Sequence, residues 1–398
     1  MKGSKISLFI LIIASISLYS LPLYSQATID TVVGSGQVGY NGDGILASQA
    51  KLYSPMAVCV DDAGNIYVAD SQNNRIRKVD VMGVIMTIAG NGVFGSMGDE
   101  RRAVEAALAF PMGVCVETVD KANNKFRIYI ADTRNNRIRM INEFGIIRTI
   151  AGSGRFGGSG DNGPAIKADL AWPSSVALDN AGNVYVADTQ NNRVRLIFNP
   201  NNKPGAGSIG SAPHIKNPKP GYIYTIAGTD FGGYGGDGEM AIIANLNQPW
   251  DVYPSNGDVY ISDKNNHIIR KVDKTGKIST IAGLPAIPGY YGDVLKATEE
   301  KLHTPYGLWT DGKTVYVADA MNSRIRSIDP AANKISTYAG IGIFGFAGDG
   351  APALNCIMSH PIDIFGDGKG NFYISDLENA VIRLIKTGGS SGGTRTTQ

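Results

Sequence analysis

Cysteine is scarce in this chain of 398 residues, which contains three: Cys59, Cys115 and Cys356. So small and odd a number excludes the disulfide scaffold that stabilises many small secreted domains. Cys59 and Cys115 each stand four residues after a proline, where later segments of similar sequence carry alanine or an aromatic residue. A position that accepts side chains of such different size serves packing, so we expect buried free thiols.

An excess of charge of one sign is also missing. Charged residues make up 18% of the chain, and the formal net charge is +2. Lys2 and Lys5 lie in the N-terminal segment, and without them the net charge is 2 − 2 = 0. A chain without an overall positive field has little attraction for polyanions. We therefore expect no nucleic-acid partner.

Long apolar runs are absent except at the N-terminus. The run 6–18 follows two lysines, and Ser25 precedes Gln26 at a plausible cleavage point, so the sequence predicts a secretory signal peptide over 1–25. The run is too short for a stable membrane anchor. We expect a secreted, periplasmic or cell-surface protein. The chain has no Asn-x-Ser/Thr sequon, which favours a bacterial source.

Glycine, in contrast, is abundant, with 50 residues. This is about one residue in eight, against a usual share of roughly 7%, and it favours an all-β protein with many tight turns. The segment "IYVADSQNNRIRKV" (66–79) recurs at 128–141, 184–197, 259–272, 315–328 and 372–385. Each copy contains two β-rich runs separated by an Asp-x-x-Asn turn, which is typical of a β-hairpin.

Two further runs flank each hairpin. The upstream run opens with proline, as in "PMAVCVD", and the downstream run reads "TIAG" or a close variant. Four short strands in each of six repeats predict a six-bladed β-propeller with four-stranded blades. The last hairpin has no "TIAG" run after it, whereas an unpaired "TVVG" stands at 31–34. We expect this N-terminal strand to complete the last blade and close the ring.

The predicted propeller occupies 26–385, and a flexible Gly/Ser/Thr-rich tail follows at 386–398. The loops that connect successive blades vary little in length, and each contains a Gly-Asp pair. Their aspartates are Asp43, Asp99, Asp161, Asp237, Asp293 and Asp349. We expect each to cap a short helical turn. The second arginine of each hairpin, such as Arg77, is expected to pair with a carboxylate.

The recurring Tyr-x-x-Asp-x-x-Asn-x-x-Ile-Arg core resembles the NHL repeat. The linker "GNGVFGSMGD…AVEAALAFP" resembles the NHL propeller of teneurins and of many exported bacterial proteins. The resemblance covers about residues 28 to 385 and implies an all-β, six-bladed NHL propeller. It implies no single function, because the family's functions are diverse.

Enzymatic chemistry requires residues that depart from the repeat. Asp251 and Asp363, two residues after a blade-opening proline, are such departures. They would point near the channel mouth, where lactonase-like propellers hold calcium. The alternative function is therefore a divalent-metal-dependent lactonase or lyase that uses these aspartates. However, the Glu and Asn ligands of those sites have no match here, and packing or capping also explains both aspartates. We assign no catalytic residue and no cofactor, with calcium left open.

The position directly after the blade-opening proline points toward the expected channel mouth. Similar peptidyl-hydroxyglycine lyases place zinc-binding histidines there, whereas this sequence has none at that position. Five of its six residues are large and apolar or aromatic, and we call them the mouth ring: Met56, Met112, Trp250, Tyr306 and Ile362. Such side chains at a concave rim suit contacts with a protein or glycan. We predict an exported, non-catalytic propeller that acts as a binding or scaffold module.

Overall fold

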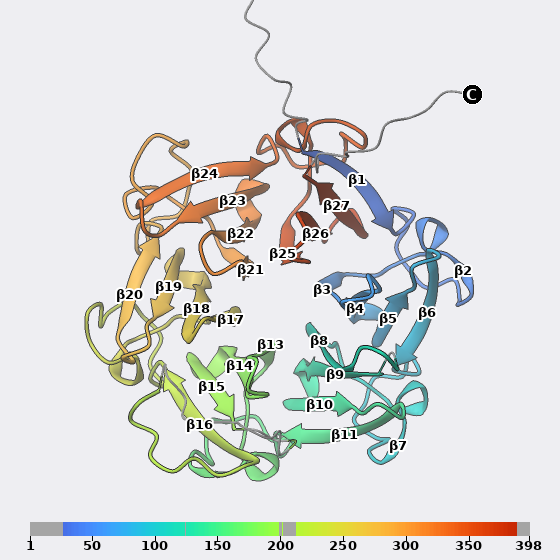
Figure 1. Cartoon of the computed structure of the whole chain (residues 1–398), viewed down its shortest axis with the longest axis horizontal. Coiled ribbons are helices and arrows are strands. Elements are labelled where there is room, and N and C mark those ends of the chain that lie inside the picture. The colour runs from blue at the N-terminus through green and yellow to red at the C-terminus, as the bar shows by residue number, and fades with distance from the viewer. Residues whose placement is uncertain (1–26, 124, 199–200, 202–211, 388–398) are drawn as a thin grey trace, which may run out of the picture.

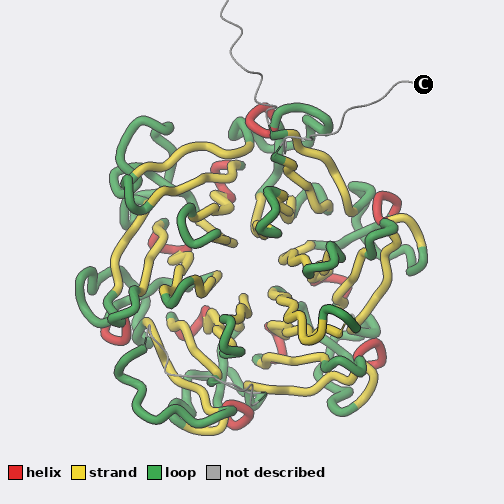
Figure 2. Tube along the Cα trace, in the orientation of Figure 1, coloured by secondary structure: helices red, strands yellow, loops and turns green. Residues whose placement is uncertain are grey.

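The computed structural model describes residues 27–123, 125–198, 201 and 212–387, and these residues form six blades around a central axis (Figure 1). The predicted signal peptide, 1–25, and nearly all of the predicted tail lie outside the described residues. Within each blade the strands follow one another outward from the axis, and loops connect them around the ring (Figure 2). The predicted six-bladed, all-β propeller is therefore confirmed.

Each blade contains an inner, a second, a third and an outer strand. The inner strands are β3 (Pro55–Val60), β8 (Gly113–Asp120), β13 (Pro173–Leu178), β17 (Asp251–Ser255), β21 (Pro305–Thr310) and β25 (Pro361–Gly366). The second strands are β4 (Ile66–Asp70), β9 (Lys125–Asp132), β14 (Val184–Asp188), β18 (Asp258–Asp263), β22 (Val315–Asp319) and β26 (Asn371–Asp376). The third strands are β5 (Arg75–Val79), β10 (Arg137–Ile141), β15 (Arg193–Ile197), β19 (Ile268–Val272), β23 (Arg324–Asp329) and β27 (Val381–Lys386). The outer strands are β6 (Val84–Ala89), β11 (Ile146–Ala151), β16 (Tyr222–Ala227), β20 (Ile278–Ala282), β24 (Lys334–Ala339) and β1 (Thr28–Val33).

Three blades have a fifth strand that the sequence did not predict. These two-residue strands are β2 (Ile45–Leu46), β7 (Arg101–Arg102) and β12 (Gly163–Pro164). Each belongs to a Gly-Asp loop and pairs with the outer strand of the blade that follows it, as Ile45 does with Ile85. The loop thus covers the exposed edge of the blade before the chain enters the inner strand.

The chain ends close the ring as predicted. Strand β1 pairs antiparallel with β27, with Ile29 opposite Ile385, and so supplies the outer strand of the sixth blade. Ile29 and Ile385 are both fully buried. Without β1, the edge of β27 would be left unpaired, which explains why the repeat is split between the two ends of the chain.

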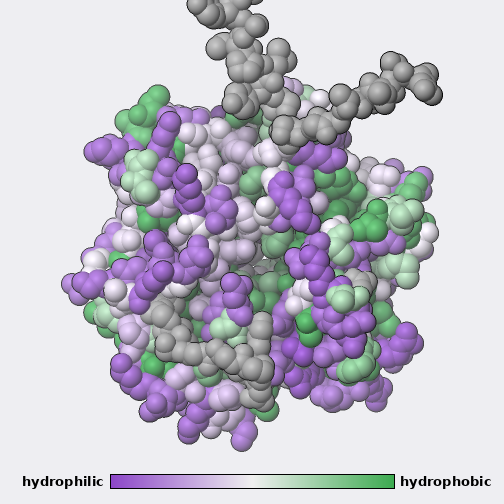
Figure 3. Space-filling view, viewed as in Figure 1, coloured by the Kyte–Doolittle hydropathy of each residue, from purple (hydrophilic) through white to green (hydrophobic). Residues whose placement is uncertain are grey.

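Apolar side chains fill the spaces between neighbouring blades. The described residues form six hydrophobic clusters, one at each boundary between blades. In the first and third blades the second strand, Ile66–Asp70 and Val184–Asp188, is buried along its whole length, because it packs against a neighbouring blade on both faces. Hydrophilic residues, in contrast, are spread round the whole ring on the face shown in Figure 3.

Short helices occur only at turns. The described residues contain ten 3₁₀ helices of three residues each, five in the hairpin turns and five in the Gly-Asp loops. The loop helices are η1 (Ala47–Gln49), η3 (Ala103–Glu105), η5 (Ala165–Lys167), η7 (Ala241–Ile243) and η10 (Ala353–Asn355), and no side chain caps their N-termini. The expectation that the loop aspartates cap these helices is therefore wrong. No helix in the described part of the chain is long and apolar enough to cross a membrane.

The loop aspartates instead pair with the buried arginines. In the first blade, Arg77 is fully buried, and its Nη2 lies 2.9 Å from Asp43 of the loop while its Nη1 lies 3.5 Å from Asp70 of the hairpin. Asp43 also accepts the Thr87 backbone N–H at 2.9 Å, and Asp70 accepts that of Tyr53 at 2.7 Å. The same pairing recurs in every blade, at Arg139, Arg195, Arg270, Arg326 and Arg383. A carboxylate partner for each arginine was predicted, and two are found.

Replacing one of these arginines should destabilise the protein strongly. In an Arg326→Met variant, Asp319 would remain fully buried without its counter-charge. Breaking a buried ion pair in this way typically costs about 3–5 kcal/mol of unfolding free energy. Chemical denaturation measures the loss, with Arg101→Met, which removes an exposed arginine, as the matched control. A loss for Arg326→Met no larger than that of the control would show that the ion pairs do not hold the blades together.

Candidate functional site

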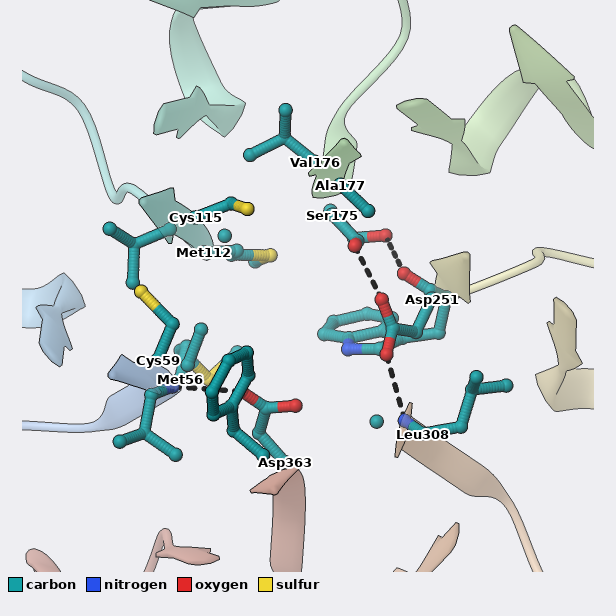
Figure 4. Close-up of a pocket in the computed structure, with 18 of the residues that line it drawn as sticks. Met56, Cys59, Met112, Cys115, Ser175, Val176, Ala177, Asp251, Leu308 and Asp363 are labelled. Atoms are coloured by element: carbon teal, nitrogen blue, oxygen red, sulfur yellow. Dashed lines mark hydrogen bonds between the residues drawn. The ribbon is translucent and has the colours of Figure 1, made fainter. Parts of the chain in front are cut away.

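The inner strands surround a narrow central channel. Its cavity has a volume of about 60 Å³ and is lined by Met56, Met112, Trp250, Asp251 and Asp363, among others (Figure 4). Pockets that bind small molecules usually have volumes of roughly 300–1,000 Å³. The channel has room for a few water molecules, and a larger ligand must bind outside it, at a mouth.

One mouth lies on the face where the six blade-opening prolines stand, which we call the Pro-side face. Trp250 and Tyr306 pack edge to face there, with ring centroids 4.7 Å apart and planes at 74°. Met56, Met112, Trp250 and Tyr306 are partly exposed, whereas Ile362 is only 2% exposed. The structure thus places the mouth ring around the channel, but Ile362 offers almost no surface to a partner.

Asp251 links three inner strands. Its carboxylate accepts hydrogen bonds from the Ser175 hydroxyl on β13, from the Leu308 N–H on β21 at 2.8 Å and from its own neighbour's N–H at 2.8 Å (Figure 4). An inner strand has no further strand beside it, so some of its N–H groups face the channel. Asp251 satisfies these groups across the boundaries of its blade.

Asp363 plays the same part between the sixth and first blades. It accepts the Val58 N–H of β3 at 2.8 Å and the Ile364 N–H at 2.9 Å. The neighbouring Gly307 makes room for this carboxylate, because a Cβ at that position would lie 2.2 Å from the Asp363 Oδ1 atom. Packing and capping therefore describe what both aspartates do in this structure.

A metal site requires more ligands than the channel offers. Among the described residues, no three His, Cys, Asp or Glu side chains are grouped so that they could hold a metal ion. Asp251 and Asp363 are the only two acidic residues among those that line the cavity, and the oxygens of both already accept N–H groups. Calcium typically takes six to eight oxygen ligands, so these residues do not fit a calcium centre.

Burial controls the protonation of both aspartates. It raises the pKa of Asp251 to about 6, against the opposing effect of the hydrogen bonds from Ser175, Leu308 and Val252. Burial, reinforced by the charge of Asp251, also raises the pKa of Asp363 well above its ordinary value. Neither carboxylate has a cationic partner comparable with the buried arginines.

The three thiols are free, as expected: Cys59 and Cys356 are buried and Cys115 is partly buried. Burial raises the pKa of Cys115 to about 12, and it also raises the pKa of Cys59. Both thiols therefore stay protonated at neutral pH, which leaves them poor nucleophiles and poor metal ligands.

Lys264, which the sequence analysis did not single out, lies beside the mouth ring. It opens the hairpin turn η8 (Lys264–Asn266), and its Nζ atom lies 4.6 Å from the centre of the Trp250 ring and 5.4 Å from that of Tyr306. Burial lowers its pKa to about 8. The equivalent residue is Ser71, Thr133 or Thr189 in the first three blades. A lysine at this position is a departure from the repeat, and this departure could have identified Lys264 from the sequence.

These observations define a closed six-bladed β-propeller with an aromatic mouth. The chain is an NHL-repeat β-propeller: residues 35–97 match the family model of the teneurin NHL domain, and residues 170–195 match that of the NHL repeat. The recognition made from the hairpin core and the Gly-Asp linker is thereby confirmed.

Relatives from animals and from a plant share the propeller region. The chain is 28% identical to NHL repeat-containing protein 2 of Gallus gallus over 91% of its own length and 51% of that protein. It is 29% identical to teneurin-4 of Homo sapiens over 67% of its own length and 10% of that protein. It is 28% identical to the chloroplastic protein SUPPRESSOR OF QUENCHING 1 of Arabidopsis thaliana over 74% of its own length and 26% of that protein. The chain thus spans about half or less of the curated relatives it matches.

Solved structures share the fold. An auxiliary nutrient binding protein from Bacteroides ovatus superposes with a TM-score of 0.60 at 15% identity, over 90% of this chain and 76% of that chain. A protein of unknown function from Bacteroides thetaiotaomicron also gives a TM-score of 0.60, at 17% identity, over 91% of this chain and 76% of that chain. At these identities the likeness shows the fold alone.

The buried carboxylate of Asp251 predicts a pH effect on stability. Its pKa in the folded protein, about 6, exceeds the value near 3.9 of an unfolded chain, so the folded state binds the proton more tightly. The contribution of this group to stability therefore falls as pH rises from 4 to 6, by at most about 1.4 kcal/mol per pH unit. An Asp251→Asn variant lacks this titration. Its unfolding free energy relative to the wild type should rise across that window, and a flat difference in urea titrations would contradict the burial argument.

Proposed function

We propose that this protein is an exported, non-catalytic binding module that holds a protein or glycan partner on its Pro-side face. The observation that carries the proposal is the mouth ring: an edge-to-face Trp250–Tyr306 pair and two methionines stand partly exposed around a channel of about 60 Å³. Tryptophan and tyrosine are enriched in binding hot spots, and methionine adapts to irregular partner surfaces.

The channel itself favours binding over catalysis. Its two carboxylates accept backbone N–H groups, and its thiols are protonated. A catalytic carboxylate must reach the substrate, yet each of these would first have to release the neighbouring inner strand. Among structures of the same fold, one is described as an auxiliary nutrient binding protein, and we extend binding, though not its ligand, to this chain.

Export rests on the sequence of residues 1–25, with its two lysines, apolar run and cleavage point. We accordingly place the protein in the periplasm, on the cell surface or outside a bacterial cell. Protein and glycan partners are both compatible with an aromatic rim, because aromatic rings offer large, rigid contact areas to either.

Truncating the aromatic pair should abolish partner binding. A Trp250→Ala, Tyr306→Ala double variant removes the aromatic side chains of the mouth ring. Its affinity for the partner should therefore fall at least about tenfold. Affinity capture from the native source and a glycan array measure the effect. The matched control is Phe144→Ala, which removes a 77% exposed aromatic side chain from the opposite face and should bind normally. Equal loss in both variants, or none in either, would contradict a binding site at the Pro-side mouth.

The alternative metal-dependent enzyme has a separate test. Elemental analysis of the purified protein should find no stoichiometric calcium or zinc. Stoichiometric metal that disappears from an Asp251→Asn, Asp363→Asn variant would overturn the non-catalytic proposal and justify a screen of lactones and esters.

A further inference from the structure

Lys264 is a cation that contacts aromatic rings but no carboxylate among the described residues. Its side chain reaches over two aromatic rings at the Pro-side mouth, with Nζ 4.6 Å from the centre of the Trp250 ring. Trp250 in turn lines the central cavity. The ammonium group therefore stands where the mouth ring and the channel meet.

This cation has no carboxylate of its own. Within the described part of the chain, Lys264 makes no ion pair and its side chain makes no hydrogen bond. The adjacent Asp263 is already committed to Arg270, at 3.5 Å, and to the Asn247 N–H, at 2.7 Å. In the same blade Lys271 has a partner, Asp258, at 2.6 Å.

The neighbouring titratable groups add no negative charge. Burial raises the pKa of Tyr306, so its hydroxyl stays neutral. His267 accepts the Thr304 N–H through Nδ1 at 3.1 Å, and burial lowers its pKa, so it too is neutral. Burial likewise lowers the pKa of His303, which packs edge-on against His267 with ring centroids 5.7 Å apart.

The fold does not require a lysine at this position. In the first three blades the equivalent hydroxyl donates to the carbonyl of the next blade's opening proline: Ser71 to Pro111 at 2.5 Å, Thr133 to Pro173 at 2.8 Å and Thr189 to Pro249 at 2.8 Å. In the fifth blade the position is held by Ala320, which has no polar group. In the sixth blade the position is held by Leu377. The turn thus forms with small or apolar side chains, and in the fourth blade a long cation stands in their place.

We propose that Lys264 recognises an anionic group of the ligand, and that this ligand carries a carboxylate next to an apolar moiety. The inference rests on the proposed function of the mouth ring and names its ligand class. One ammonium group balances the single negative charge of a carboxylate, whereas a phosphate monoester carries about 1.5 to 2 negative charges at neutral pH. The apolar moiety would contact Trp250 and, across the channel mouth, Met56 and Met112, which line the same cavity.

The test uses two probes of nearly the same shape, 4-phenylbutyrate, which is negatively charged, and its amide, which is neutral. Titration calorimetry of the purified full chain should show the carboxylate binding at least about tenfold more tightly than the amide, because a charge-assisted contact is the stronger one. Lys264→Met should remove the preference and Lys264→Arg, which keeps the charge, should retain it. Lys313→Met, which removes an exposed lysine from the opposite face, is the matched control and should behave as the wild type.

Thermal unfolding of each variant confirms that it is folded. Equal affinity for the two probes, a preference that survives Lys264→Met, or no binding of either probe would each overturn the inference. The proposed function is judged separately, by whether the Trp250→Ala, Tyr306→Ala variant loses its captured partner. If the wild type captures a partner through the mouth ring but binds the two probes equally, the proposed function stands and the inference about Lys264 is refuted.

Discussion

The architecture depends on one interaction repeated six times, a fully buried arginine held between two aspartates. In the first blade Arg77 joins the hairpin aspartate Asp70 to the loop aspartate Asp43. Through Asp43 it also reaches the outer strand at Thr87, and through Asp70 it reaches the loop that enters the inner strand. A single guanidinium thus fixes the third strand, the outer strand and two points of the Gly-Asp loop, Asp43 and Tyr53, relative to one another.

The pairing register of the strands also changes at the buried arginine. Pairing between the third and outer strands shifts beside the buried arginine in each blade, as between Ile76 and Arg77. A β-bulge bends a strand and redirects its side chains, which here lets the threonine opposite the arginine turn toward the loop aspartate. The glycine that ends the outer strand belongs to the same arrangement, because a Cβ on Gly90 would lie 2.2 Å from the Asn74 carbonyl oxygen.

Local patterns in the sequence were sufficient to predict the hairpins, the six blades and the closure by β1, because each depends on residues that are close in the chain or on a count of strands. The role of the loop aspartates was not predictable in the same way. Asp43 and Arg77 are separated by 34 positions, and a Gly-Asp pair before a helical turn suggests a cap just as well. The fifth strands escaped prediction for a related reason, since two residues carry no periodicity.

At the channel, the sequence identified Asp251 and Asp363 as unusual residues but did not predict what each of them does. Asp251 and Asp363 were left open between metal binding and capping, and that choice depends on N–H groups of neighbouring blades, such as that of Leu308, 57 positions away from Asp251. Lys264 was visible as a charged residue where the other blades carry Ser, Thr, Ala or Leu, yet only the structure shows that it lies over Trp250 without a counter-charge.

Asp251 and Lys264 both depart from the repeat, but they differ in how freely they could bind a ligand. A ligand that took the Asp251 carboxylate would leave the N–H groups of two inner strands unsatisfied, at a cost of about 1–3 kcal/mol for each buried group. The fold does not need the Lys264 side chain in this way, because the same turn forms in other blades with a hydroxyl or a methyl group at this position. A ligand anion would gain the full strength of a charge-assisted contact there without breaking one that holds the ring together. Asp251 and Asp363 thus serve the closure of the ring, whereas Lys264 lies beside partly exposed aromatic rings without a carboxylate among the described residues. Under our proposal, the anionic group of the ligand supplies that missing carboxylate.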